Sequence, residues 1–187
     1  MTDPSTKPSD ELLRFLDGFI VESDRAAVVV GCAMLDELLE QVLKRAFLPC
    51  STTEDDLLGS EKPLGSFSAR IHLAHRLGLI DSAFSRQLHL IKKLRNDFAH
   101  KLSASTLDAS PHRDRIREIV EPFAKRIDYD ALSANTKSQY GVSLSKTSLG
   151  FRVAIAITAA RLEFLNESCG SRAADNPCAL VPATWRG

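Results

Sequence analysis

Apolar residues recur every three or four positions through most of the chain, a spacing that places them on one face of an α-helix. No segment alternates apolar and polar residues in the way that a half-buried strand does. We therefore predict an all-α fold, a helical bundle of about six helices. The first expected helix begins at residue 9 or 10. The expected helices cover residues 10–20, 24–47, 66–77, 82–101, 111–123 and 148–168.

Local signals mark where these helices begin and end. We expect Ser9 or Asp10 to cap the first helix, Asp81 the fourth, and Ser110 the fifth, with Pro111 as its first residue. Gly78 is expected to end the third helix, and a long irregular link is expected after residue 123. The inward residues expected for the first two helices are Leu12, Leu13, Leu16, Phe19, Ile20, Val28, Cys32, Leu35, Leu39, Val42 and Ala46.

The last expected helix differs from the others because it is apolar nearly all round between Val153 and Ala160. Such a helix is typically buried on every side, so we expect it to lie at the centre of the bundle. Its apolar stretch is shorter than the ~20 residues that span a bilayer, and we expect no membrane association.

The chain has 187 residues, of which 44% are apolar and 26% charged, values typical of a single globular domain. We expect a disordered N-terminus over residues 1–8, one helical domain over 9–168 and a flexible C-terminal tail over 169–187. The 24 basic residues balance the 24 acidic ones, so only a local patch would attract nucleic acid.

The first nine residues are polar and lack the apolar run of a secretory signal, which predicts a cytoplasmic protein. The four cysteines (Cys32, Cys50, Cys169 and Cys178) lie far apart and lack metal-binding spacing, so we expect free thiols. A regulatory disulfide between Cys169 and Cys178 is the alternative. The sequence matches no phosphate-binding loop, dinucleotide fingerprint, zinc-protease helix or nucleophile elbow, and we expect no metal and no cofactor.

The segment with candidate chemistry is Arg-Asn-Asp-Phe-Ala-His, residues 95–100, at the end of the fourth expected helix. At 100° per residue Arg95 and His100 lie about 140° apart, whereas Asn96 and His100 are neighbours at i,i+4. We therefore expect Asn96 to fix the tautomer of His100. Arg95 falls within the apolar stripe of this helix, so it needs a partner: Asp36, Glu37 or Glu40, a second subunit, or a phosphate.

Arg-Asn-x-x-x-His at the end of a long helix resembles the signature of the HEPN superfamily. Residues 62–71, with the sequence KPLGSFSARI, continue to Leu-Gly-Leu-Ile at 77–80, and this stretch resembles the mannitol operon repressor family, a HEPN-like group. Ala-Met-Leu-Asp-Glu-Leu-Leu-Glu at 33–40 fits the same pattern, and the resemblance covers about residues 23–102. It implies a helical bundle, commonly a homodimer in which the motif helices of two protomers meet.

The resemblance also implies roles for individual residues. In catalytic members the histidine assists attack of an RNA 2′-hydroxyl on the adjacent phosphate without metal, which would make His100 the acid or base. Arg95 would hold the phosphate and Asn96 would orient either partner. Lys92, Lys93 and Lys101 are candidates for positioning RNA, because residues 86–117 carry eight basic residues against Asp97, Asp108 and Asp114. Asp97 departs from this pattern, since its charge would oppose phosphate.

Several alternatives remain open at this point. Many HEPN proteins bind RNA or proteins without cutting, so a non-catalytic regulator acting through protein or nucleic-acid binding is the alternative to a metal-independent endoribonuclease. The basic residues near the helix end also fit a structural role at the helix dipole. We do not expect direct DNA binding through Arg86 and His89, although Ala74, Gly78 and Phe84 have helix-turn-helix spacing. His72 and His75 share a helical face but lack a third metal ligand nearby, and a protein partner for the acidic segment 54–61 is a further alternative.

Overall fold

The structure, a computed structural model, describes residues 8–47, 55–100 and 106–169. This part of the chain contains seven α-helices, one short 3-10 helix and no strand, which confirms the predicted all-α bundle. The helices are α1 (Asp10–Phe19), α2 (Asp24–Ala46), α3 (Phe67–Arg76), α4 (Ser82–His100), α5 (His112–Val120), α6 (Tyr129–Tyr140) and α7 (Lys146–Cys169), with the 3-10 helix at Ala124–Arg126.

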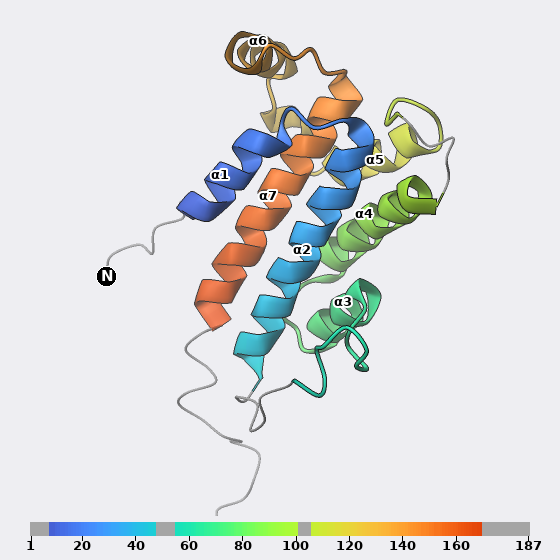
Figure 1. The fold of residues 1–187 in the computed structure, drawn as a ribbon, viewed down its shortest axis with the longest axis vertical. Coiled ribbons are helices and arrows are strands. Elements are labelled where there is room, and N and C mark those ends of the chain that lie inside the picture. Colours follow the sequence, from blue (N-terminus) through green and yellow to red (C-terminus); the bar gives the residue numbers. More distant parts are fainter. Residues whose placement is uncertain (1–7, 48–54, 101–105, 170–187) are drawn as a thin grey trace, which may run out of the picture.

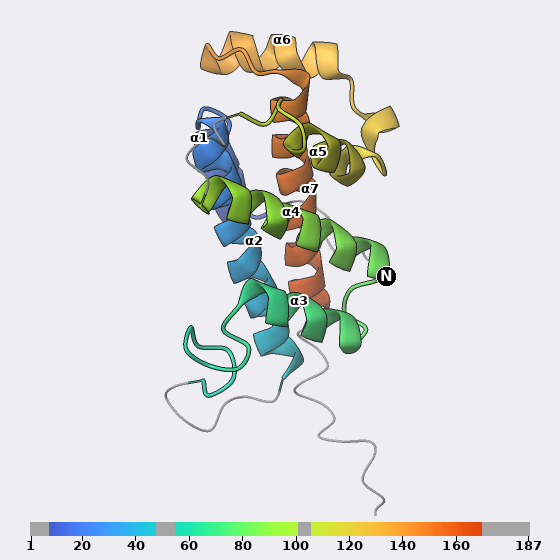
Figure 2. The same cartoon turned by 90° about the vertical axis from the view of Figure 1, so that its right-hand side faces the viewer.

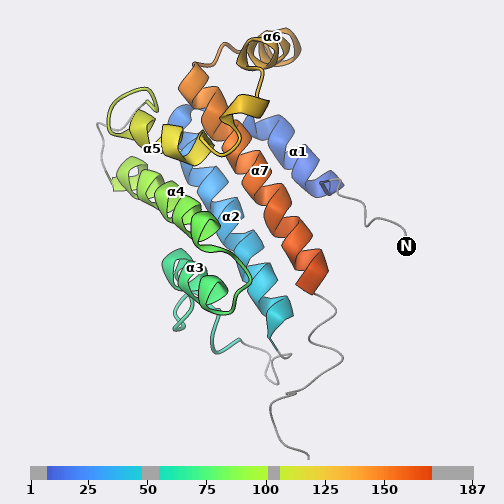
Figure 3. The same ribbon diagram turned by 180° about the vertical axis from the view of Figure 1, so that it is seen from behind.

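Two long helices, α2 and α7, run side by side through the middle of the bundle (Figure 1). Helix α1 packs on α7, which lies between α1 and α2 when the molecule is seen from behind (Figure 3). Helices α5, α4 and α3 follow one another along the other side of this pair, and α6 covers the end of α7 (Figure 2). This layering places α4 between α3 and α5, with one face against α2.

Short polar side chains start most of the helices, as is typical of these residue types. Ser9, Ser23 and Ser66 each accept a hydrogen bond from the backbone N–H three residues later. Asp81 does the same for Phe84, at 2.7 Å, which confirms it as the cap of α4. Gly78 has φ +72°, a conformation that favours glycine, and it follows the C-cap residue of α3 as predicted.

The core lies where α2, α4 and α7 meet, and its largest fully buried side chains include Leu35, Phe98 and Phe151. Helix α7 packs against α1, α2, α5 and α6, which confirms its central position. Its apolar stretch is nevertheless not buried all round, because Ile157 is 42% exposed. Leu13 also differs from expectation: it lies on the outer side of α1 and is 47% exposed.

The region after residue 123 is where prediction and structure differ most. The expected irregular link contains α6, which Asp128 caps through a bond from Ala131 N and which ends at Gly141, with φ +70°. Thr136 is the one buried residue of this helix. Helix α6 therefore lacks an apolar stripe, and periodicity is not able to reveal a helix without one.

Helix α5 begins later than predicted. Pro111 occupies the cap position with φ −92° and ψ 5° and is not the first helical residue, and α5 ends at Val120 and not at residue 123. The Ser110 hydroxyl, expected to cap the helix, instead bonds to the Asp114 carboxylate at 3.2 Å. The sequence therefore predicts the start of this helix to within one residue, but Ser110 does not form the expected capping hydrogen bond.

The cysteines of the described ranges are Cys32 and Cys169, and both are buried free thiols. Cys169 is the last residue of α7. Cys50 and Cys178 lie outside the described residues, as do nearly all of the segments expected to be a disordered N-terminus and a flexible tail.

Candidate functional site

The motif residues occupy the last turns of α4. Arg95 and His100 are exposed and Asn96 is partly buried, so the expectation that Arg95 lies within the apolar stripe is wrong. The stripe residues Leu94 and Phe98 turn inward, and the helix rotation carries Arg95 to the edge of that face. The Arg95 guanidinium donates a hydrogen bond to Asn96 Oδ1 at 3.1 Å.

The expected contact between Asn96 and His100 is not observed. The amide oxygen of Asn96 is engaged by Arg95, and the His100 imidazole has no hydrogen-bond partner among the described residues. Arg95 and His100 are therefore not brought together within one chain. The geometry agrees with the wide angular separation that the helix imposes on these two positions.

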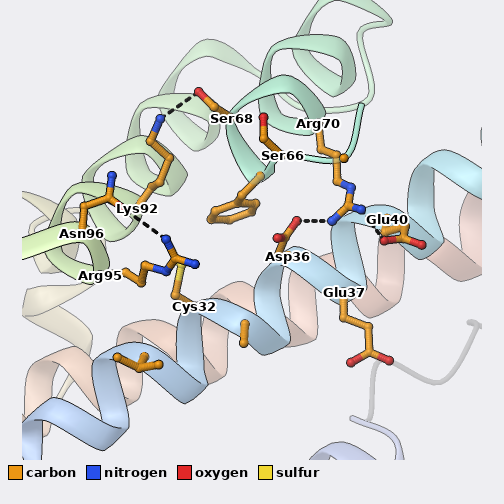
Figure 4. Close-up of a pocket in the computed structure, with 14 residues that line it drawn as sticks. Cys32, Asp36, Glu37, Glu40, Ser66, Ser68, Arg70, Lys92, Arg95 and Asn96 are labelled. Carbon is orange, nitrogen blue, oxygen red and sulfur yellow. Dashed lines mark hydrogen bonds and ion pairs between the residues drawn. The ribbon is translucent and has the colours of Figure 1, made fainter. Parts of the chain in front are cut away.

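Arg95 and Asn96 line a cavity of about 530 Å³ between α2, α3 and α4 (Figure 4). Helix α2 forms one wall with Cys32, Asp36 and neighbouring residues, and α4 forms the opposite wall. The start of α3 and the loop before it close a third side. The lining residues are Val29, Cys32, Ala33, Asp36, Glu37, Glu40, Gly65, Ser66, Phe67, Ser68, Arg70, Lys92, Arg95 and Asn96.

Arg70, on α3, is the residue of this region that sequence reasoning missed. Its buried guanidinium bonds to Asp36 Oδ1 and Glu40 Oε2, each at 2.5 Å, and to the Leu58 carbonyl at 2.8 Å. Asp36 and Glu40, two of the candidate partners of Arg95, pair with Arg70 instead. A signal was present, because Arg70 falls on the same helical face as Phe67, Ile71 and Ala74, and all four residues are buried.

This ion pair shapes the electrostatics of the cavity. Partial burial raises the pKa of Asp36 above its usual value, and the neighbouring Arg70 opposes that rise. Burial also raises the pKa of the Cys32 thiol to about 12, against a smaller opposing effect of the Arg95 charge. Cys32 is therefore a neutral, apolar part of the lining near neutral pH and not a nucleophile.

The three lysines of the predicted RNA-binding set differ in their surroundings. Lys92 lines the cavity and donates a hydrogen bond to Ser68 Oγ at 2.8 Å (Figure 4). Lys93 is exposed on the neighbouring face of α4, and Lys101 lies outside the described residues. The structure thus places Lys92 together with Arg95 and Asn96, but Lys93 apart from them.

Asp97, expected to oppose an anion at the motif, faces α5 instead. It pairs with the Arg115 guanidinium and lies 3.6 Å from His112 Nε2. His112 is buried against Phe98, with ring centroids 4.8 Å apart, and its Nδ1 lies 3.2 Å from the Thr106 carbonyl oxygen. The charge of Asp97 is therefore balanced on the side of α4 away from the cavity.

The other histidines and Arg86 take part in local contacts. The rings of His72 and His89 lie 4.7 Å apart, and His75 lies 3.1 Å from the Ser82 hydroxyl. Within the described ranges, no group of three potential metal ligands comes together. Arg86, the residue considered for reading DNA bases, pairs with Glu118 of α5.

The loop before α3 is built around residues that hold it against the cavity. The Asp55 carboxylate accepts hydrogen bonds from the backbone of residues 57 and 58, and Leu58 is buried. Gly65 lies so close to the loop backbone that a Cβ there would be 2.3 Å from the Ser60 carbonyl oxygen. The loop backbone is therefore closely packed around Gly65, which lines the cavity.

These features define an all-helical bundle with an open, charged cavity beside the end of its fourth helix. None of the described helices combines the length and apolar character needed to cross a membrane. No family model matches the sequence, and no curated protein matches it significantly.

Among solved structures, the fold is similar to that of YggD, a possible transcriptional regulator from Shigella flexneri 2a str. 2457T. The TM-score is 0.58 and the sequence identity is 20%, over 86% of this chain and 98% of the other. At this identity the similarity shows a shared fold.

Proposed function

We propose that this protein is a non-catalytic regulator of the mannitol operon repressor type, a cytoplasmic homodimer that acts by binding a macromolecular partner. The observation that carries the proposal is the separation of the motif. Arg95 lines the cavity with Asn96, while His100 does not line it and has no orienting partner among the described residues. A catalytic base is commonly oriented by a third group, whereas a binding surface requires no such group.

The comparison with known structures supports the same proposal. The Shigella flexneri protein with the similar fold is itself described as a possible transcriptional regulator. Arg86 is paired with Glu118, and the apolar face of α4 is packed in the core. We therefore propose regulation through a protein or RNA partner and not through α4 as a DNA recognition helix.

A metal-independent endoribonuclease is the second candidate, and one observation favours it. Because Arg115 balances Asp97, the exposed end of α4 presents Arg95 and His100 without the opposing charge that the sequence suggested. In such an enzyme His100 would move the proton of the 2′-hydroxyl, while Arg95 and Asn96 would bind the phosphate. The two groups would meet across the two-fold axis of a dimer.

Incubation of a mixed pool of structured and single-stranded RNA with the protein and excess EDTA tests the two candidates. The wild type is compared with Arg95→Ala and His100→Ala, after circular dichroism and light scattering have established fold and mass. We expect intact RNA with all three proteins. Cyclic-phosphate ends produced by the wild type and lost in both variants would overturn the regulator and establish the ribonuclease.

Mixing the two variants adds a test of where an active site would lie. If Arg95 of one protomer works with His100 of the other, a mixed dimer contains one complete site and one site that lacks both groups. Cleavage would then return on mixing two inactive proteins. Cleavage that stays absent on mixing, with an active wild type, would place the site within one protomer.

A further inference from the structure

The cavity between α2, α3 and α4 carries opposite charges on its two long walls. Lys92 and Arg95 lie on the α4 wall, and Asp36 lies on the α2 wall (Figure 4). Val29, Ala33 and Phe67 add apolar surface to the lining. A volume of about 530 Å³ falls within the range of small-molecule sites in proteins.

The ion pairs around the cavity leave Lys92 and Arg95 without an acidic partner among the described residues. Among the described residues, Asp36 and Glu40 bond to Arg70, and Glu40 also pairs with Lys44 at 2.6 Å. Within the described ranges, the hydrogen bonds of Lys92 and Arg95 go to uncharged acceptors, the Ser68 hydroxyl and the Asn96 amide oxygen. An ammonium has three N–H donors and a guanidinium five, so most of these donors remain available.

The spacing of the two cations suits one ligand group. Lys92 and Arg95 are i,i+3 neighbours, with Cβ atoms about 5 to 6 Å apart on one helix face. Two cations at that separation can share a carboxylate or phosphate, and Arg95 can bind it through two parallel N–H groups. The Ser68 hydroxyl, already bonded to Lys92, lies beside the same position.

The opposite wall offers acceptors for the rest of a ligand. Arg70 bonds to Oδ1 of Asp36, and no described residue bonds to Oδ2. That oxygen can accept a hydrogen bond from a hydroxyl or an ammonium group. A ligand that fits both walls therefore has an oxyanion at one end and a hydrogen-bond donor at the other.

We propose that this cavity binds a small organic anion with a hydroxyl- or amino-bearing body, whose oxyanion contacts Lys92 and Arg95 and whose donor group contacts Asp36. The ligand is the small-molecule effector of the regulator, and only this effector role rests on the proposed function. Binding itself depends on the cavity alone.

Isothermal titration calorimetry of the full chain tests the proposal with four probes. Glycerol phosphate and glycerate share a hydroxylated body and differ in the oxyanion, while glycerol lacks the anion and inorganic phosphate lacks the body. We expect saturable 1:1 binding of glycerol phosphate or glycerate, at least tenfold tighter than inorganic phosphate, and none of glycerol. The tighter binder of glycerol phosphate and glycerate shows whether the site prefers a phosphate or a carboxylate. Absence of saturable binding for both, or equal binding of glycerol, overturns the proposal.

Variants assign the binding to this cavity. Lys92→Met removes the charge but keeps the side-chain stem, and Ala33→Phe fills the cavity from an exposed position of α2. Each should weaken binding at least tenfold with an unchanged melting temperature. Arg76→Ala removes an exposed cation of α3 that does not line the cavity and should leave binding unchanged. Equal binding by the wild type, Lys92→Met and Ala33→Phe would overturn the assignment.

The two proposals fail separately. The RNA measurement decides between regulator and ribonuclease, and the calorimetry decides whether the cavity holds an anion. A protein that leaves RNA intact and binds none of the probes retains the first proposal and loses the second. A protein that cuts RNA and binds glycerol phosphate through Lys92 loses the first proposal and retains the second. The ligand is then not the effector of a regulator.

Discussion

Arg70 and Arg95 approach α2 from neighbouring helices and line the same cavity, yet their surroundings are opposite. The Arg70 side chain is 7% exposed and bonds to two carboxylates and a carbonyl. Arg95 is exposed, and its hydrogen bond goes to the amide of the next residue. One arginine is closed into the structure, and the other is open to solvent.

This difference separates a structural cation from a binding cation. A guanidinium that leaves water needs hydrogen bonds and a counter-charge inside the protein. The two terminal nitrogens of Arg70 obtain both from α2 and the loop before α3, while its buried Nε has no hydrogen-bond partner among the described residues. An exposed guanidinium keeps its hydration, so the fold neither depends on it nor uses up its donors. Arg95 is therefore the arginine that remains free to meet a ligand.

Arg70→Ala provides the strongest test of this comparison. The substitution leaves Asp36 and Glu40 facing each other without their cation, and we expect a loss of about 3 kcal/mol in the free energy of unfolding. Urea unfolding at pH 7 measures it. Arg76→Ala, on the exposed face of the same helix, is the control and should change the value by less than ~0.5 kcal/mol. A similarly small effect at Arg70 would contradict the structural role.

Arg115 offers an intermediate case, with a side chain 28% exposed and paired with Asp97. We expect Arg115→Ala to cost about 1.5 kcal/mol, because a charge-assisted hydrogen bond is lost while Asp97 keeps His112 nearby. The same urea experiment gives the order Arg70, Arg115, Arg95 from largest to smallest loss. An order that does not follow exposure would break the comparison.

Arg95→Ala should change the unfolding free energy by less than ~0.5 kcal/mol, as is usual for an exposed residue. The same variant should lose the binding of glycerol phosphate or glycerate in the calorimeter. We therefore expect the loss of stability at Arg70 and the loss of binding without a loss of stability at Arg95. A large loss of stability in Arg95→Ala would make it a structural residue and remove it from the proposed site.

The pH dependence of stability gives the smallest expected effect. Because burial raises the pKa of Asp36 in the folded protein, the folded state holds this proton more tightly than the unfolded state. The contribution of Asp36 to stability therefore increases as pH falls through the folded pKa and is fully present below the unfolded value of 3.8. Urea unfolding between pH 7 and pH 4 should show the wild type gaining stability relative to Asp36→Asn. A wild type that loses stability relative to Asp36→Asn as the pH falls would contradict the raised pKa of Asp36.

Much of the fold follows from local sequence signals. The serines before α1, α2 and α3, Asp81 before α4 and Gly78 after α3 act as their residue types predict. Helix α6 was not predicted, because it buries a single residue, Thr136, and so has no apolar stripe. Hydrophobic periodicity reveals a helix that buries an apolar face. It does not reveal a helix that is marked mainly by the residues at its two ends.

The place of the motif on its helix was predictable from the sequence, but the pairings around it were not. The sequence places Arg95 and Asn96 in the last turns of α4, where the structure has them. It does not reveal that Asp36 and Glu40 bond to Arg70, because that choice depends on how α3 and α4 are set against α2. Likewise, the partner of Asp97 is on α5, and only the packed bundle brings Arg115 to it.

Gly65 shows how the absence of a side chain limits change at the cavity. A Cβ there would lie 2.3 Å from the Ser60 carbonyl oxygen and 2.4 Å from that of Gly59, both backbone atoms that do not move aside easily. In a saturation library this position should accept glycine alone, whereas exposed Ala33 on the opposite wall should accept many residues. Directed evolution of a new ligand preference would therefore proceed through α2 and leave the loop unaltered.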